Sequence, residues 1–163
     1  MQDAEKITYI NILIDTLKKK EQILKKLMEA TERQSTLFDD KEFDLDAFDR
    51  IVAEKDKLLE RLERLDEGFL NLYDKVRDEL RENGAEYSDQ IGKTRELVKI
   101  QTELSTSLMA AEERNRSKLT LYLSKSHRKV KEFKTSSRTA AAYYKNMSGK
   151  HQDGDSYFFN KKK

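Results

Sequence analysis

Apolar residues recur every three or four positions over a long stretch in the middle of the chain. The stripe consists of Phe48, Ile51, Leu58, Leu62, Leu65, Phe69, Leu72 and Val76, and it is widened by Leu59, Tyr73 and Leu80. Lys55 is the one charged residue on it. This spacing predicts an amphipathic helix at about residues 45–82. Because a stripe this wide can serve two partner helices, we expect this helix to be the middle and most buried one of a bundle.

Two further stretches show the same helical spacing. One covers residues 3–36. The other begins near residue 86, where Tyr87, Thr94, Gln101, Leu108, Asn115 and Tyr122 are spaced by seven. Asp44 is placed to cap the helix at 45–82, and Asn83-Gly84 to end it. Because short connections join antiparallel neighbours, the predicted fold is all-α, an antiparallel three-helix coiled-coil bundle.

Several residues of these patterns have a specific expected place. Phe38 and Phe43 should close one end of the bundle, because they flank the connection between the first two helices. Gln101 and Asn115 interrupt the stripe of the third helix. They either fix the register of the bundle from buried positions or lie at its partly exposed edge.

The helix lengths predict that the third helix is extended. A helix over residues 45–82 is about 57 Å long at 1.5 Å per residue. The third helix, folding back from residue 86, therefore draws level with its start near Leu123, yet the apolar pattern continues through Val130 and Phe133. We expect one bundle domain at residues 1–133 and a weakly helical to flexible tail at residues 134–163.

Composition and charge support long helices that each bury one stripe. Charged residues make up 39% of the chain and hydrophobic residues 36%, with no Pro and no Cys. No apolar run approaches the roughly 20 residues of a membrane span, and the N-terminus lacks the pattern of a signal peptide, so we expect a cytoplasmic protein. The net charge of +2 is uneven: residues 118–163 carry 12 basic and 3 acidic side chains. This basic part either meets a partner or folds back on the acidic bundle.

The residues typical of catalysis and metal binding are missing from the sequence patterns. His127 and His151 are 24 residues apart, and neither follows an acid by three positions as in the Glu-x-x-His motif of di-iron bundles. Gly-rich phosphate loops and catalytic-triad spacings are also absent. We therefore expect no enzyme activity, no cofactor and no metal.

Apolar and aromatic residues near the C-terminus predict a partner-binding surface. Leu119, Tyr122, Leu123, Val130 and Phe133 share one helix face. A face of this kind without an intramolecular partner can receive a helix from another protein. The candidate partner-binding residues are these five together with Tyr143 and Tyr144. Tyr157, Phe158 and Phe159 form a further aromatic group, which either orders on binding a partner or folds back on the bundle.

The chain resembles the FlgN-type flagellar chaperones. The resemblance rests on three runs: FDRIVAEKDKLLERLERL at residues 48–65, EERNRSKL at 112–119, and YFFNKKK at 157–163. It implies a cytoplasmic type III export chaperone without enzyme activity. Such a chaperone binds the C-terminal helices of hook-associated (hook-filament junction) proteins and delivers them to the flagellar export gate. Tyr157, Phe158 and Phe159 are then assigned to docking at the export machinery.

Two other functions compete with this interpretation. One is a structural coiled-coil protein that forms homo-oligomers and has no client; for a chaperone we expect a monomer or a weak dimer. The other is a protein that binds nucleic acid or anionic membranes through its basic C-terminal part. It ranks last, because the aromatic residues cluster apart from the densest basic stretch at residues 125–134. We therefore expect no nucleic-acid partner and no membrane insertion.

Overall fold

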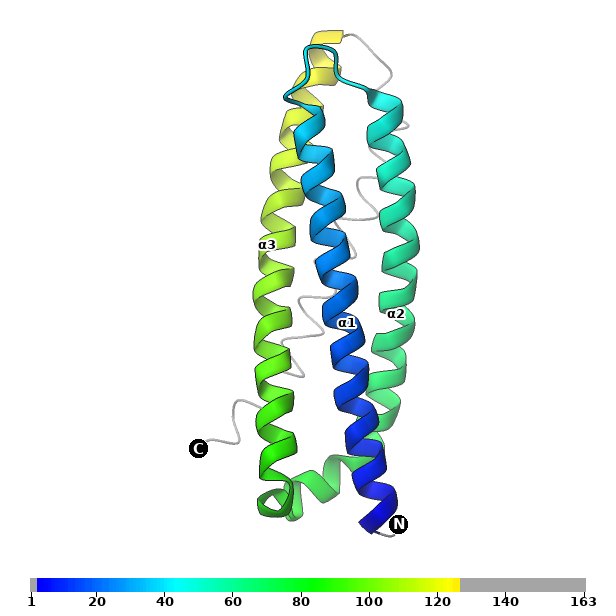
Figure 1. Ribbon diagram of the computed structural model, residues 1–163, viewed down its shortest axis with the longest axis vertical. Coiled ribbons are helices and arrows are strands. Elements are labelled where there is room, and N and C mark those ends of the chain that lie inside the picture. Colours follow the sequence, from blue (N-terminus) through cyan, green and yellow to red (C-terminus); the bar gives the residue numbers. More distant parts are fainter. Residues whose placement is uncertain (1–2, 127–163) are drawn as a thin grey trace.

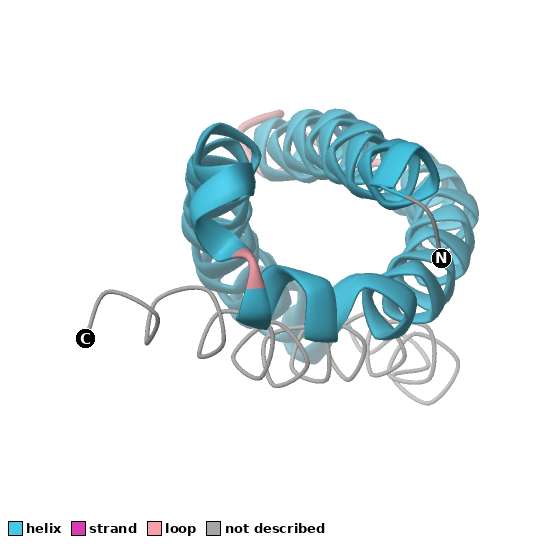
Figure 2. Cartoon of the chain, turned by 90° about the horizontal axis from the view of Figure 1, so that it is seen from below, coloured by secondary structure: helices cyan, strands magenta, loops and turns pink. Residues whose placement is uncertain are grey.

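Three long helices make up almost all of the structure, a computed structural model that describes residues 3–126. They are α1 (Asp3–Leu37), α2 (Leu45–Glu82) and α3 (Ser88–Ser126), with a short 3-10 helix η1 (Gly84–Tyr87) between the last two. Consecutive helices run in opposite directions (Figure 1). Seen from below, the described chain consists of helices joined by short loops (Figure 2). The prediction of an all-α bundle of three long helices is confirmed.

Local sequence signals account for the limits of α2. The Asp44 side chain accepts a hydrogen bond from the Ala47 backbone N–H at 2.9 Å, which caps the start of the helix as the sequence predicts. At the other end, the Asn83 N–H donates to the Glu79 carbonyl oxygen. Gly84 then opens η1, so α3 begins at Ser88, two residues later than the sequence indicates. The predicted continuation of this helix to residue 133 lies outside the described residues.

The central helix is α1, and the expectation that α2 is the most buried helix is wrong. α1 lies between α2 and α3 in Figure 1 and packs against both. Within residues 3–126, no Cα atom of α2 comes within 8 Å of a Cα atom of α3. Several residues of the α2 stripe, including Ile51, Leu65 and Leu72, are only half-buried. The regular apolar spacing of α2 shows that it is amphipathic, but it does not show how many neighbours that stripe meets.

The core is divided into three apolar clusters along the bundle axis. The lower cluster joins Ile10, Leu13, Ile14 and Leu17 of α1 to Val76, Leu80, Tyr87, Ile91, Leu97 and Val98. The middle cluster contains Ile23, Leu24, Leu27, Leu58, Leu59, Leu62 and Leu108. The upper cluster is built on Phe48, Leu119 and Leu123. Buried polar residues lie between these clusters along the helices. They fix the register of the helices, that is, which residues of neighbouring helices lie at the same height.

Gln101 and Asn115 are two of these buried polar residues. Gln101 is 0% exposed and Asn115 is 3% exposed. The Gln101 amide donates to the Leu17 carbonyl oxygen at 2.6 Å, and the Asn115 amide donates to the Thr31 carbonyl oxygen at 3.0 Å. Both side chains thus connect α3 to the backbone of α1. The alternative that they lie at the exposed edge of the bundle is wrong.

Candidate partner-binding surface

An aromatic cluster closes the end of the bundle where α3 meets the connection between α1 and α2. The Phe38 and Phe43 rings stack with their centroids 4.6 Å apart, and each lies within 6 Å of the Phe48 ring. Tyr122 packs on Phe43 at a centroid distance of 4.6 Å. Such aromatic pairs stabilise beyond the area that they bury. The prediction that Phe38 and Phe43 close this end is confirmed.

Three of the candidate partner-binding residues belong to this end of the bundle. Leu119 and Leu123 are 4% and 3% exposed in the upper cluster, whereas Tyr122 is half-buried beside it. The two leucines therefore hold α3 against Phe48, and Tyr122 is the one of the three with accessible surface. The remaining candidates lie outside the described residues: Val130, Phe133, Tyr143, Tyr144, Tyr157, Phe158 and Phe159.

The structure adds one residue that the sequence analysis missed. Leu121 is 56% exposed, the most exposed large apolar side chain of residues 3–126. It falls outside the apolar stripe of α3, so periodicity gives no reason to select it. The signal that could have found it is a large apolar residue on the otherwise polar face of an amphipathic helix. It is turned by about 100° from Tyr122, so these two accessible apolar side chains lie on different faces of the end of α3.

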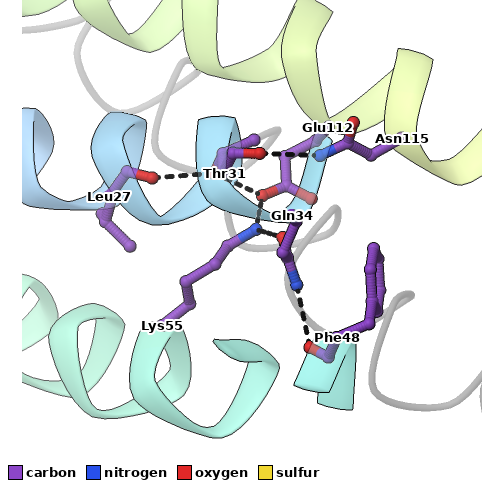
Figure 3. Close-up of polar contacts among 7 residues, drawn as sticks. All are labelled: Leu27, Thr31, Gln34, Phe48, Lys55, Glu112 and Asn115. Carbon is purple, nitrogen blue, oxygen red and sulfur yellow. Dashed lines mark hydrogen bonds and ion pairs between the residues drawn. The ribbon is translucent and has the colours of Figure 1, made fainter. Parts of the chain in front are cut away.

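A buried ion pair lies one layer below this end (Figure 3). The Lys55 side chain is 3% exposed and contacts the carboxylate of Glu112, which is 16% exposed. Its Nζ also donates to Gln34 Oε1 at 2.7 Å. Burial lowers the pKa of Lys55 below its ordinary value, and the Glu112 carboxylate opposes this shift. This layer connects all three helices, because Gln34, Lys55 and Glu112 come from α1, α2 and α3.

Further hydrogen bonds satisfy the partners of this ion pair. The Thr31 hydroxyl lies 3.2 Å from Glu112 Oε1 and 2.7 Å from the Leu27 carbonyl oxygen. The Gln34 amide donates to the Phe48 carbonyl oxygen at 3.3 Å. A buried charge surrounded in this way is tolerated because its donors and acceptors are used within the protein. These contacts assign the Lys55 layer to packing and register.

A small hollow adjoins this layer between α1 and α3. Its volume is about 270 Å³, and it is lined by Met28, Thr31, Glu32, Ser35, Ser107, Ala110, Ala111, Arg114 and Asn115. Ligand pockets usually exceed about 300 Å³ and are mostly apolar. This hollow is smaller and mixed in polarity, so it is a weak candidate for a ligand site.

Two kinds of site are absent from residues 3–126. No three His, Cys, Asp or Glu side chains gather there as a metal ion would require. None of α1, α2 and α3 has an apolar stretch sufficient to cross a bilayer. The surface with accessible apolar groups at the end of α3 therefore remains the strongest candidate site of this part of the chain.

Comparison with known proteins identifies the family. A family model described as FlgN protein matches residues 1–143, which is most of the chain. The chain belongs to the FlgN family. No curated protein and no solved structure matches it. FlgN proteins are flagellar export chaperones for hook-associated proteins, and they are not enzymes. The resemblance to this family is confirmed, and the matched residues include the runs at 48–65 and 112–119; the run at 157–163 lies outside the match.

Proposed function

We propose that this FlgN protein binds the C-terminal helices of a hook-associated protein at the end of α3. The binding surface starts at Tyr122 and continues along the chain through Val130, Phe133, Tyr143 and Tyr144. One observation carries the proposal: the half-buried Tyr122 ring near the end of α3 packs on a closed aromatic cluster and keeps accessible surface. A rigid base beside exposed apolar groups suits the docking of an amphipathic helix.

Leu119 and Leu123 contribute to this surface indirectly. Both are buried against Phe48, so they position α3 and the Tyr122 ring. Their replacement by Ala would loosen the end of the bundle as well as the surface. Experiments on client binding therefore need residues with accessible side chains.

Calorimetry with the purified hook-associated client tests the surface. Phe133→Ala and Tyr122→Ala should each weaken the complex about tenfold or more, because buried aromatic anchors contribute most to helix docking. Leu70→Ala is the matched control: Leu70 is 52% exposed on α2, and its loss should leave affinity unchanged. Circular dichroism should show that all three variants keep their helices. Unchanged affinity in both aromatic variants would refute the surface.

We further propose that the client is delivered to the export gate through the aromatic tail. Tyr157→Ala and Phe158→Ala, like changes at Phe159, should leave client affinity nearly intact while reducing export of the client by cells. The opposite result, loss of client binding in the tail variants and none in the α3 variants, would reverse the two assignments. FlgN chaperones are cytoplasmic, and we assign this chain to the cytoplasm as well.

The competing proposal of a structural homo-oligomer is tested by light scattering of the protein alone. A chaperone of this kind should be a monomer or a weak dimer. A stable oligomer that binds no hook-associated protein would favour the structural coiled coil.

A further inference from the structure

Acidic and basic side chains are separated on two flanks of α2. The acidic flank consists of Asp49, Asp56, Glu60, Glu63, Glu67 and Asp74, spaced so that all six share one side of the helix. The basic flank consists of Arg50, Lys57, Arg61 and Arg64, each directly after an acidic residue and therefore turned by about 100°. All are exposed except Asp56, which is half-buried.

Contacts with α1 show which way the acidic flank faces. Glu54 pairs with Arg33 at 2.6 Å, Glu79 pairs with Lys6 at 2.8 Å, and the Lys75 Nζ lies 5.3 Å from the centre of the Tyr9 ring. These three α2 residues are turned about 80–140° from the acidic flank, and the buried residues Leu58, Leu62 and Val76, which pack in the clusters with α1, lie about opposite to it. The acidic flank therefore faces away from α1, toward the side where α2 and α3 stay apart.

The described part of the chain leaves this acidic flank largely unneutralised. Among residues 3–126, no Lys or Arg nitrogen lies within 4.0 Å of the carboxylates of Asp49, Asp56, Glu60, Glu63 or Glu67. Partial burial raises the pKa of Asp56; Lys55 opposes this shift, and repulsion from Glu60 and Asp49 adds to it. A row of like charges of this kind is relieved by a cationic partner.

The C-terminal segment has the matching chemistry. Residues 127–147 contain six basic side chains and one acidic side chain. Val130, Phe133, Ala140, Tyr144 and Met147 recur at the spacing of an amphipathic helix. Lys131, Arg138 and Lys145 are spaced by seven, as are Asp49, Asp56 and Glu63. Each basic residue follows its acidic counterpart by the same 82 positions.

We propose that residues 130–147 of this chain dock as a helix along the α2–α3 side of the bundle, parallel to α2, with their basic flank on the acidic flank of α2. The bundle then has four helices, and the fourth lies opposite α1.

The end of α3 sets the register of this docking. Leu119 and Leu123 pack on Phe48, so the last turns of α3 are level with the first turns of α2. If the chain reverses just after Ser126, residue 131 returns near the level of Asp49. From there the 18 residues 130–147 reach about 27 Å along α2. The same register pairs Arg138 with Asp56 and Lys145 with Glu63.

Docking of this segment goes beyond the proposed function and does not require a client. It places Val130, Phe133 and Tyr144 against the bundle, and the proposed function assigns these residues to the client. A bound client would then release the segment. Individual exposed ion pairs are weak and are screened by salt, so the docked segment is suited to displacement.

Cysteine cross-linking of the full chain, without client, tests the docking. The chain has no Cys, so introduced thiols react unambiguously. Glu60→Cys with Ala142→Cys keeps the same spacing of 82 and leaves the three proposed ion pairs intact. A short bismaleimide should join them within one chain about tenfold faster than in the control, Arg61→Cys with Ala142→Cys, because docking raises the local concentration. Arg61 is exposed on the basic flank, turned by about 100° from Glu60.

Charge reversal separates docking from mere proximity. Asp49→Lys, Asp56→Lys and Glu63→Lys together should reduce the cross-linking rate to that of the control. Adding Lys131→Glu, Arg138→Glu and Lys145→Glu should restore it. Equal rates for the test and control pairs, or cross-links only between two chains, would overturn the proposal. A rate unchanged by charge reversal would also overturn it.

The same cross-link distinguishes this proposal from the proposed client site. Addition of the client should lower the cross-linking rate if client and bundle share the segment. If the client fails to bind, the cross-link should still form in its absence. If the proposed client site is wrong, the cross-link still forms; if the docking is wrong, the cross-link does not form. The two failures are therefore distinguishable.

Discussion

Lys55 places a charge in the interior of a bundle whose neighbouring layers are apolar. Removal of an ammonium group from water is unfavourable, and the contacts with Glu112 and Gln34 offset that loss only in one alignment of the helices. A shift of α2 by one heptad would bring Lys55 to the level of Leu62, where the middle cluster is apolar. The polar layer therefore penalises incorrect registers.

The Lys55 layer gives a prediction for stability. Lys55→Met should lower the free energy of unfolding by about 3 kcal/mol, because it leaves the Glu112 carboxylate without its cation. Combining it with Glu112→Leu should recover at least half of that loss. Urea unfolding measures both. Lys57→Met, at an exposed position, is the control and should change little. A double variant less stable than the single one would contradict this account.

Glu79 gives a prediction for pH dependence. Hydrogen bonds from Lys6, and then from Asn83 and Tyr87, lower the pKa of Glu79 from its ordinary value of 4.5. Because the folded-state pKa is the lower one, this carboxylate stabilises the fold above pH 4.5, and the contribution is lost as the pH falls through the folded-state pKa. Glu79→Gln should therefore be less stable than the parent at neutral pH.

Thermal melts over a pH series would check this expectation. The difference in melting temperature between parent and Glu79→Gln should shrink as the pH falls below 4.5. Glu82→Gln, on the same turn but exposed, is the matched control variant. A difference that stays constant across the series would mean that ionisation of Glu79 does not stabilise the fold.

Sequence predicts single residues well where the signal is local. The Asp44 cap involves a partner three positions away, and Lys55 is conspicuous as the charged residue on an apolar stripe. Its partners are not predictable in this way. Gln34 lies 21 positions away and Glu112 lies 57 positions away, so the network depends on the packing of three helices.

At the scale of elements, tertiary contacts explain where the sequence prediction failed. α3 begins later than the sequence predicts because Tyr87 is 3% exposed in the lower cluster and its hydroxyl donates to Glu79 Oε1 at 3.1 Å. These contacts hold Gly84–Tyr87 in a 3-10 turn that helix propensity alone does not predict. The sequence analysis missed the central position of α1 for a similar reason. Periodicity describes a single helix, whereas burial depends on the helices that pack around it.

Different burial of two leucines of α2 predicts different effects. Leu62 is 0% exposed in the middle cluster, so Leu62→Ala should cost about 2–5 kcal/mol. Leu65, which the sequence places equally in the core, is half-buried, and Leu65→Ala should cost less than about 2 kcal/mol. Chemical denaturation of the two variants gives the comparison. Equal losses would mean that both sites are packed alike.

Gly68 allows a prediction in the stabilising direction. It lies inside α2, and a Cβ atom added there would meet no atom within 4 Å. Close packing therefore does not explain this glycine. Gly68→Ala should stabilise the protein by about 0.5–1 kcal/mol, because Ala loses less backbone entropy on helix formation. A lower melting temperature for this variant would point to a contact of Gly68 that this account omits.

At the scale of the whole molecule, apolar clusters alternate with polar layers along three helices. The apolar clusters supply the stabilisation, and the polar layers select one alignment. The sequence predicted the bundle, because long amphipathic stripes and short connections allow few other arrangements. The candidate site was less predictable. Leu119 and Leu123 share a face with Val130, but only the packed structure shows that these two leucines are buried and that Leu121 is exposed.

Two truncations test how the C-terminal part contributes to the whole fold. Deletion of residues 150–163 should leave helicity and melting temperature nearly unchanged, because the bundle core of residues 3–126 is complete without them. Deletion of residues 127–163 should lower the melting temperature by several degrees more, about the effect of losing 1–2 kcal/mol in a domain of this size. The reason is that it also removes residues 130–147, which we infer to cover the acidic flank of α2.

High salt should reduce the difference in melting temperature between the two truncations, because it screens the charges of that flank. Equal melting temperatures at low salt would show that residues 127–149 add nothing to the bundle, and a large drop on the shorter deletion would show that residues 150–163 are part of it.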